Sequence, residues 1–109
     1  MVALTLATTL ANAAQGASDA ATAISPARQK ELVHFVRHDC GSCHGLTLRG
    51  GLGPPLTPEA LKGKPAAYVK AMILDSRPGT AMPHWRPLLP EAEAAWIAEK
   101  LLQGLPDVD

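Results

Sequence analysis

The sequence predicts a small all-α domain built from three helices that are joined by two long loops. Apolar residues recur at helical spacing in three stretches, residues 26–39, 65–75 and 90–103. The two stretches between them, residues 45–58 and 76–89, are rich in glycine and proline, which favour loops. No stretch has the alternating pattern of a half-buried β-strand. With 109 residues, the chain has room for one domain.

The first helix is expected to begin at Ser25-Pro26, because serine caps helices and proline suits the first turn. It is expected to run to Asp39 and to deliver the chain to Cys40. Its apolar positions are Leu32, Phe35 and Val36.

The second helix is expected to bury a face formed by Tyr68, Met72 and Ala71. The third helix has the clearest signals, with proline and acidic residues in its first turn and Gly104 and Pro106 after its last. Its apolar face consists of Ala94, Ile97 and Leu101.

The N-terminal residues resemble a secretory signal. An apolar run, Val2 to Leu10, is followed by a small-x-small pattern that ends at Ala13, although no Lys or Arg precedes the run. We therefore expect a signal peptide over 1–13, a flexible lead-in over 14–25 and a folded domain over 26–106. A disordered Ala-rich terminus is the alternative. The run is too short to span a bilayer, and no later segment is long enough.

The composition indicates that the domain has too few large apolar side chains to form a stable core by itself. About 80 residues would fold, and a chain of that length builds only a marginal core unaided. The whole chain has four aromatic residues, so an apolar group in the centre would complete the interior. The aromatic residues are Phe35, Tyr68, Trp85 and Trp96.

The net charge is zero, but the charges are unevenly placed. Between Cys40 and Arg86 the net charge is +4, whereas the charged residues after Pro90 are all acidic except Lys100. The bases of the first segment are Arg49, Lys62, Lys64, Lys70, Arg77 and Arg86. There is no basic run and no interleaving of aromatic and basic residues, so the sequence does not predict nucleic-acid binding.

Residues 40–44 form a CxxCH sequence, which is the attachment motif of c-type haem. Cys40 and Cys43 lie three residues apart on one helical turn, so both thiols can add to the vinyl groups at one porphyrin edge. His44 then falls below the iron and can donate an imidazole nitrogen. Gly41 and Ser42 are small, which lets the backbone approach the ring.

Three other interpretations of the two cysteines remain open. An exported protein can use them for a disulfide. A thioredoxin-like redox pair is expected within a βαβ pattern, which is absent here. A zinc site needs four ligands, and only scattered histidines are available beyond the motif.

An electron carrier needs a sixth iron ligand, and Met82 is the preferred candidate. It lies in a loop with prolines on both sides, which would hold it with little reorganisation. Met72 is expected to be a core residue. His34 and His38 are either a solvated helix face or a metal-binding pair, and His84 points elsewhere. Methionine opposite histidine raises the reduction potential and closes the iron to small substrates, which favours electron transfer over catalysis.

The motifs together resemble class I c-type cytochromes over residues 26–104. The shared features are CxxCH after a first helix, the GPPL sequence at 53–56, a GTAMP loop and a final amphipathic helix. The stretches DCGSCHGLTLRGGLGPPLTPEAL, RPGTAMPHW and WIAEKL are most similar to the cytochrome c55X family, the NirC-type periplasmic cytochromes of denitrifying bacteria. The resemblance implies a small class I cytochrome c fold, with three main helices around one covalently bound haem.

The resemblance also implies roles for single residues. The carbonyl of Pro54 would accept the proton of the His44 ring and so orient it. Leu56 would pack on the haem, and Trp85 would shield the side of Met82.

One position departs from the class. Many members carry glycine eight residues before the first cysteine, where the terminal helices touch, and this chain has Leu32 there. We expect the helices to cross at a different point or to sit farther apart. Phe35 and Trp96 are expected near that contact.

The function implied is outer-sphere electron transfer by a monomeric, periplasmic, non-enzymatic protein. Electrons would pass through the haem edge near the thioethers, and the basic segment would meet an acidic patch on a protein partner. The implied partner is a cytochrome cd-type nitrite reductase. The alternatives are electron supply during maturation of its d-type haem, a haem-based sensor or peroxidase with a labile sixth ligand, and a thiol oxidoreductase.

Overall fold

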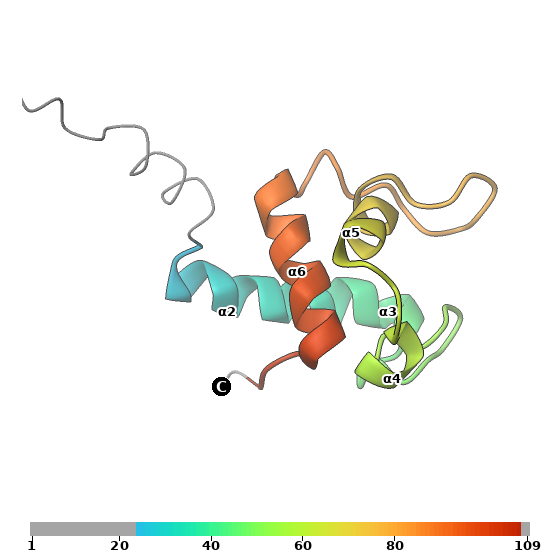
Figure 1. Cartoon of the computed structure of the whole chain (residues 1–109), viewed down its shortest axis with the longest axis horizontal. Coiled ribbons are helices and arrows are strands. Elements are labelled where there is room, and N and C mark those ends of the chain that lie inside the picture. Colours follow the sequence, from blue (N-terminus) through green and yellow to red (C-terminus); the bar gives the residue numbers. More distant parts are fainter. Residues whose placement is uncertain (1–23, 108–109) are drawn as a thin grey trace, which may run out of the picture.

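The computed structural model describes residues 24–107, which form helices and loops with no strand in that range. The helices, shown in Figure 1, are α2 (Pro26–Phe35), η1 (Val36–Cys40), α3 (Gly41–His44), α4 (Pro58–Leu61), α5 (Ala66–Asp75) and α6 (Glu91–Gln103). The predicted signal peptide and residues 14–23 of the predicted lead-in lie outside the described residues. None of the helices described is long and apolar enough to cross a membrane.

The first helix extends farther than the sequence pattern predicts. Ser25 caps α2 by accepting a hydrogen bond of 3.1 Å from the backbone N–H of Arg28. The helix does not end at Asp39 but continues through η1, a π-helical turn, into α3 (Figure 1). The N–H of Gly41 bonds to the carbonyl of Val36, five residues back. This wider turn resets the side-chain register just before the CxxCH residues.

The buried face of α5 differs from the predicted one. Tyr68 is 38% exposed and Ala71 is exposed, while Met72 is half-buried. The residues that α5 buries are Val69, Ile73 and Leu74. Apolar residues occur on nearly every side of this helix, so their spacing does not identify the face. Packing against α6 buries the branched side chains and leaves the hydroxyl end of the tyrosine in solvent.

Helix α6 is the centre of the core, and its predicted face is confirmed. Ala94, Ile97 and Leu101 are buried, together with Ala98. The helix packs mainly on α5 and also contacts α2 and α4. The short helix α4, which the sequence pattern does not predict, is capped by Thr57, whose hydroxyl accepts a hydrogen bond of 3.3 Å.

Figure 1 shows α6 crossing the long first helix at a steep angle. Leu32, at the position where many class I cytochromes c carry glycine, is 1% exposed and shares a buried cluster with Ala94 and Ala98 of α6. The small alanine side chains leave room for the larger leucine. Arg28 and Glu93 join the two helices through hydrogen bonds of 2.8 and 2.7 Å between the guanidinium and both carboxylate oxygens.

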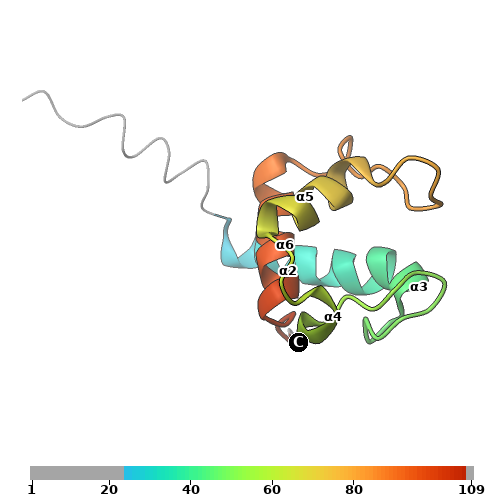
Figure 2. The same cartoon turned by 45° about the vertical axis from the view of Figure 1, so that its right-hand side comes forward.

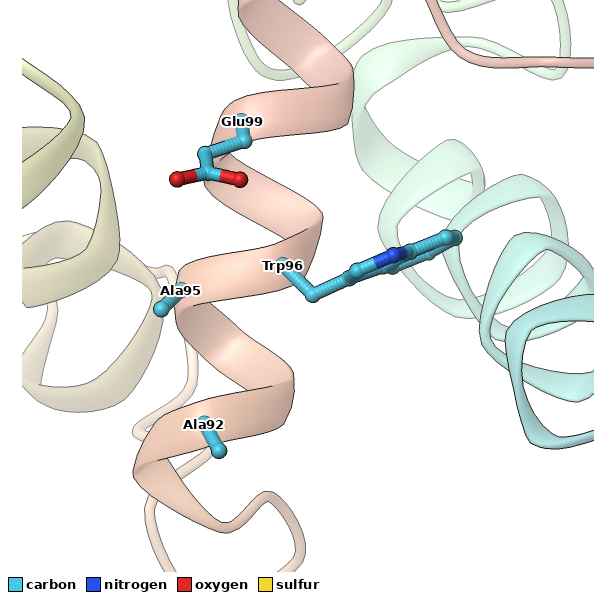
Figure 3. A pocket seen from close by; sticks show the side chains of 4 residues that line it. All are labelled: Ala92, Ala95, Trp96 and Glu99. Carbon is cyan, nitrogen blue, oxygen red and sulfur yellow. The ribbon is translucent and has the colours of Figure 1, made fainter. Parts of the chain in front are cut away.

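Phe35 and Trp96, expected near this crossing, are both half-buried against the core. Phe35 meets Trp85 edge to face, with ring centroids 5.0 Å apart. Figure 3 shows the indole of Trp96 extending from α6 on the side of the cyan first helix. Beside it, an open depression is lined by Ala92, Ala95, Trp96 and Glu99.

We predict that Glu93→Gln destabilises the protein by about 1 kcal/mol near neutral pH, since Arg28 is partly open to solvent. The hydrogen bonds from Arg28 hold the pKa of Glu93 below its usual value of 4.5. The stabilisation is therefore present above that value and is lost as the pH falls through the folded-state pKa. Urea denaturation at pH 7 and pH 3 measures both effects. Glu99→Gln on the same helix is the control, and equal losses from the two substitutions would contradict the prediction.

Candidate haem site

The two cysteines lie at the end of the long first helix. Cys40 ends η1 and is buried, whereas Cys43 lies within α3 and is exposed. Both thiols are free, and they are three residues apart on one helical turn. Burial raises the pKa of the Cys40 thiol to about 11, with a smaller contribution from the charge of Asp39.

His44 is buried and its ring is fixed by one hydrogen bond. The Nδ1 atom lies 2.7 Å from the carbonyl oxygen of Pro54. A carbonyl oxygen only accepts hydrogen bonds, so the proton is on Nδ1 and the lone pair is on Nε2. The ring therefore has the tautomer and the orientation that a metal ligand needs.

Gly53 is a residue of the site that the sequence pattern does not identify. A Cβ atom at this position would lie 2.7 Å from both Cε1 and Nδ1 of His44. That distance is too short for any side chain, so only glycine lets the loop pass directly over the imidazole ring. The density of glycines predicts a loop but does not show which glycine the ring requires.

Backbone hydrogen bonds tie the loop after α3 to the helix that carries His44. The N–H of Gly53 bonds to the carbonyl of Cys43, and the N–H of Gly50 bonds to the carbonyl of His44, both at 2.8 Å. The loop therefore folds back onto the same turn that holds the CxxCH residues.

A second part of this loop is held around Leu48. The N–H of Leu56 bonds to the carbonyl of Leu48 at 2.8 Å. Leu48 is buried with a φ of 61°, a conformation that costs energy in a non-glycine residue. The loop is thus held in one shape, which places Pro54 and half-buried Leu56.

The loop that contains Met82 is closed at its base. The N–H groups of Trp85 and Arg86 bond to the carbonyls of Ile73 and Leu74 in the last turn of α5, at 3.3 and 3.1 Å. The intervening residues project from the body of the protein (Figure 1).

His84, which is not expected to be an iron ligand, lies at the base of the Met82 loop. Its Nε2 atom is 3.4 Å from the hydroxyl of Ser76, the residue that follows α5. This contact engages one of the two ring nitrogens of His84.

An ion pair reinforces the base of the loop. Arg86 donates hydrogen bonds of 2.7 and 2.6 Å to the two carboxylate oxygens of Asp75, the last residue of α5. It also bonds to Glu91 at the start of α6, at 3.2 Å. These bonds lower the pKa of Asp75 and raise that of Arg86. The loop therefore begins and ends on a fixed frame.

His44 and Met82 belong to elements on opposite sides of the domain. Figures 1 and 2 both show α5 and the Met82 loop on one side, with α3 and the loop after it on the other. Met82 is half-buried, and Trp85 is half-buried against the core at the loop's return. This arrangement suits a group held between two opposed ligands.

The other uses of the cysteines fit less well. No group of three or more metal-binding side chains occurs within residues 24–107, which argues against zinc. A thiol oxidoreductase needs an accessible thiol of low pKa, and Cys40 does not suit that role because its thiol is buried with a raised pKa, which leaves Cys43 as the exposed thiol of the pair. The stacked rings of His34 and His38, with centroids 6.1 Å apart, lie on the exposed face of the first helix.

The residues present fit a haem. Two free thiols lie on one turn, the adjacent imidazole has its Nε2 lone pair available, and a glycine lets the loop lie on the ring. The loop that contains Met82 is closed at its base and lies across the domain from α3 (Figure 2).

Comparisons with known proteins identify the family. Residues 27–99 match the family described as "Cytochrome C oxidase, cbb3-type, subunit III". Cytochrome c55X of Paracoccus denitrificans (strain Pd 1222) is 60% identical over 77 residues, which cover 71% of this chain and 75% of that protein. The solved structure of "c-type cytochrome NirC" has a TM-score of 0.73 at 50% identity, covering 75% of this chain and 96% of that one.

The chain also resembles one part of a larger protein. The structure titled "Dihydro-heme d1 dehydrogenase NirN in complex with DHE" has a TM-score of 0.63 at 34% identity, over 72% of this chain but only 17% of that one. The all-α cytochrome fold is thus common to both comparisons. The chain belongs to the cytochrome c55X family, the NirC-type c-type cytochromes, which carry haem c and transfer electrons rather than catalyse a reaction.

Proposed function

We propose that this chain is a periplasmic electron carrier of denitrification that passes single electrons to a cytochrome cd-type nitrite reductase. It would hold one haem through thioether bonds at Cys40 and Cys43, with His44 and Met82 as the axial ligands. The observation that carries the proposal is the 2.7 Å hydrogen bond from His44 to Pro54, which leaves Nε2 free beside two free thiols. The bound haem would supply the iron that gains and loses one electron.

The protein's own residues would keep both ligands still during that change. Pro54 and Gly53 fix the ring of His44 from two directions. The closed base of the loop would limit the movement of Met82. A fixed ligand pair reorganises little when the iron changes charge, which favours fast electron transfer.

Two half-buried apolar residues would cover the haem. Leu56 lies in the loop after α3, and Trp85 lies where the Met82 loop returns to the core. Side chains in these places would keep water from both faces of the haem.

Maturation of d-type haem is the second candidate, and the resemblance to part of NirN favours it. That protein's title names a dihydro-haem d1 dehydrogenase, and a part of it that makes up 17% of its chain is similar to 72% of this one. Removing two hydrogens from a dihydro-haem releases two electrons and two protons. A carrier of single electrons would therefore act twice for each dehydrogenation.

Export would bring the chain to the same compartment as these partners. We propose cleavage near Ala13, which leaves residues 14–25 as a lead-in and residues 26–106 as a monomeric cytochrome domain. The apolar run before Ala13 supports this proposal.

Stopped-flow mixing tests the donor role. The protein is coexpressed with a c-haem maturation system, reduced, and mixed with oxidised cd-type nitrite reductase. We expect rapid oxidation of the cytochrome, slowed by added salt because surface charges guide the encounter. Slow oxidation of a correctly formed low-spin cytochrome would contradict the donor role and favour maturation, which is then tested with dihydro-haem d1 dehydrogenase as the electron source.

Met82→Ala tests the sixth ligand. We expect loss of the weak absorption band of sulfur-ligated ferric haem, a lower reduction potential and new binding of carbon monoxide, because the iron would lose its thioether ligand. Met72→Leu is the matched control on α5 and should leave all three unchanged. Carbon monoxide binding by the unmodified protein at neutral pH would instead favour a sensor or peroxidase.

Gly53→Ala tests the contact with the His44 ring. The added methyl group would displace the ring and destabilise the haem-loaded protein by on the order of 1–3 kcal/mol. The reduction potential should also shift, since the bond to Pro54 would be strained. Gly63→Ala is the control: Gly63 has a φ of 84° with no atom within 4 Å of an added Cβ. It should cost about 1 kcal/mol of backbone strain and leave the potential unchanged.

A further inference from the structure

We propose that the outer surface of α5 is a docking site for carboxylate groups of a redox protein partner, formed by Lys64, Tyr68 and Arg77. These three residues are called the α5 patch below. The inference rests on the proposed role as an electron carrier and adds where the partner binds and which chemistry recognises it.

Two cations converge on one exposed aromatic residue in this patch. The ammonium of Lys64 lies 5.4 Å from the centroid of the Tyr68 ring, and Nη2 of Arg77 donates a hydrogen bond of 3.0 Å to the Tyr68 hydroxyl. Lys64 lies two positions before the first residue of α5, and Arg77 lies two positions after the last. Their side chains therefore reach the same tyrosine from opposite ends of the helix.

The charge of the α5 patch is not neutralised within residues 24–107. Neither Lys64 nor Arg77 has a carboxylate within 4.0 Å in that range. Both contact neutral groups of Tyr68 instead, Lys64 its ring and Arg77 its hydroxyl. Two other cations of the basic segment do pair with carboxylates, Lys70 at 3.8 Å and Arg86 at 2.6 Å.

The sequence predicts that the basic segment meets an acidic patch on the partner, and the ion pairs narrow this prediction to part of the segment. Ion pairs weaken the field of two of its cations, while the cations of the α5 patch keep theirs. Arg49 and Lys62 are also exposed and have no carboxylate partner in the described range, but neither lies over an aromatic ring there.

Lys64 and Arg77, held on one tyrosine, are expected to bind a carboxylate more strongly than cations spread over a solvated surface would. Two like charges held on one side chain repel each other, and a bound anion relieves that repulsion. Arg77 has donor atoms left for a carboxylate, and the Tyr68 hydroxyl accepts from Arg77 while its own proton can be donated. Tyrosine and arginine are also the residue types that contribute most often to binding at protein interfaces.

The α5 patch lies on the methionine side of the domain. Arg77 starts the loop that carries Met82, and the hydroxyl of Thr80 donates a hydrogen bond of 2.7 Å to the Arg77 carbonyl. Figure 2 shows α5 and this loop on the side away from α3, which carries exposed Cys43. A partner docked here would approach the Met82 loop rather than the thioether edge.

An anionic probe tests the patch without any protein partner. Hexacyanochromate(III), a paramagnetic anion, is added to the haem-loaded protein, and the broadening of amide resonances is measured by NMR. We expect the strongest broadening at Lys64, Tyr68 and Arg77. Lys64→Glu/Arg77→Glu should abolish it there, whereas the control Lys30→Glu/Lys100→Glu, with the same change in net charge, should preserve it. Broadening that is uniform or centred elsewhere would overturn the proposal.

Electron transfer to cd-type nitrite reductase is the second measurement. At low salt the Lys64→Glu/Arg77→Glu rate should fall by about tenfold and lose most of its salt dependence. The control should change by less than about twofold. Equal slowing of both variants would mean that only net charge matters and would overturn the patch.

The two measurements separate the possible failures. A wild-type protein that binds the anion at the patch but does not reduce the reductase would leave the docking site standing and reject the reductase as its partner. A second outcome combines two results: the anion causes no broadening at the α5 patch, and Lys64→Glu/Arg77→Glu shifts the reduction potential. It would mean that Lys64 and Arg77 bind the carboxylates of the protein's own haem. That outcome would overturn the docking proposal and leave the electron-carrier function intact.

Discussion

The contact of the His44 ring with Gly53 and Pro54 is the constraint on which the rest of the site depends. A free imidazole has two tautomers and rotates, whereas this one carries its proton on Nδ1 and lies under a loop that leaves no space for a side chain. Holding Pro54 at that point requires the loop to fold back onto α3 through backbone hydrogen bonds. The same constraint accounts for the positive φ of Leu48, because its burial and its bond to Leu56 hold the loop in this shape.

The core connects this fixed histidine with the methionine on the other side. The first helix, which ends in His44, contacts α6, and α6 packs on α5, from which the Met82 loop leaves. Arg28 and Glu93 join the first pair of helices, and Arg86 joins the end of α5 to the start of α6. The two segments that carry the proposed iron ligands are therefore attached to one packed unit, although the domain is small. Attached in this way, His44 and the base of the Met82 loop have little freedom to move apart.

Local chemistry determines the features that the sequence predicts correctly. The regular apolar spacing of α6 leaves one possible buried face, and that face is the one observed. The face of α5 is not predictable, because its apolar residues occur on most sides and only the contact with α6 selects Val69 and Ile73. The π-helical turn before Gly41 is not predictable from the sequence either, because no residue type is specific to it. The role of Gly53 depends on a ring nine positions away, which a local pattern does not reveal.

The distribution of charge shows the same difference between local pattern and spatial arrangement. Counted along the chain, the basic segment looks uniform, yet folding pairs some of its cations with acidic residues that lie far away in sequence. Lys70 reaches Glu91 on α6, whereas Arg77 turns back to Tyr68 on the helix that precedes it. The field that a partner meets is set by the cations that folding leaves unneutralised within residues 24–107, and these are only part of the basic segment. A net charge of zero is therefore compatible with a locally positive surface, and its position follows from the ion pairs rather than from the composition.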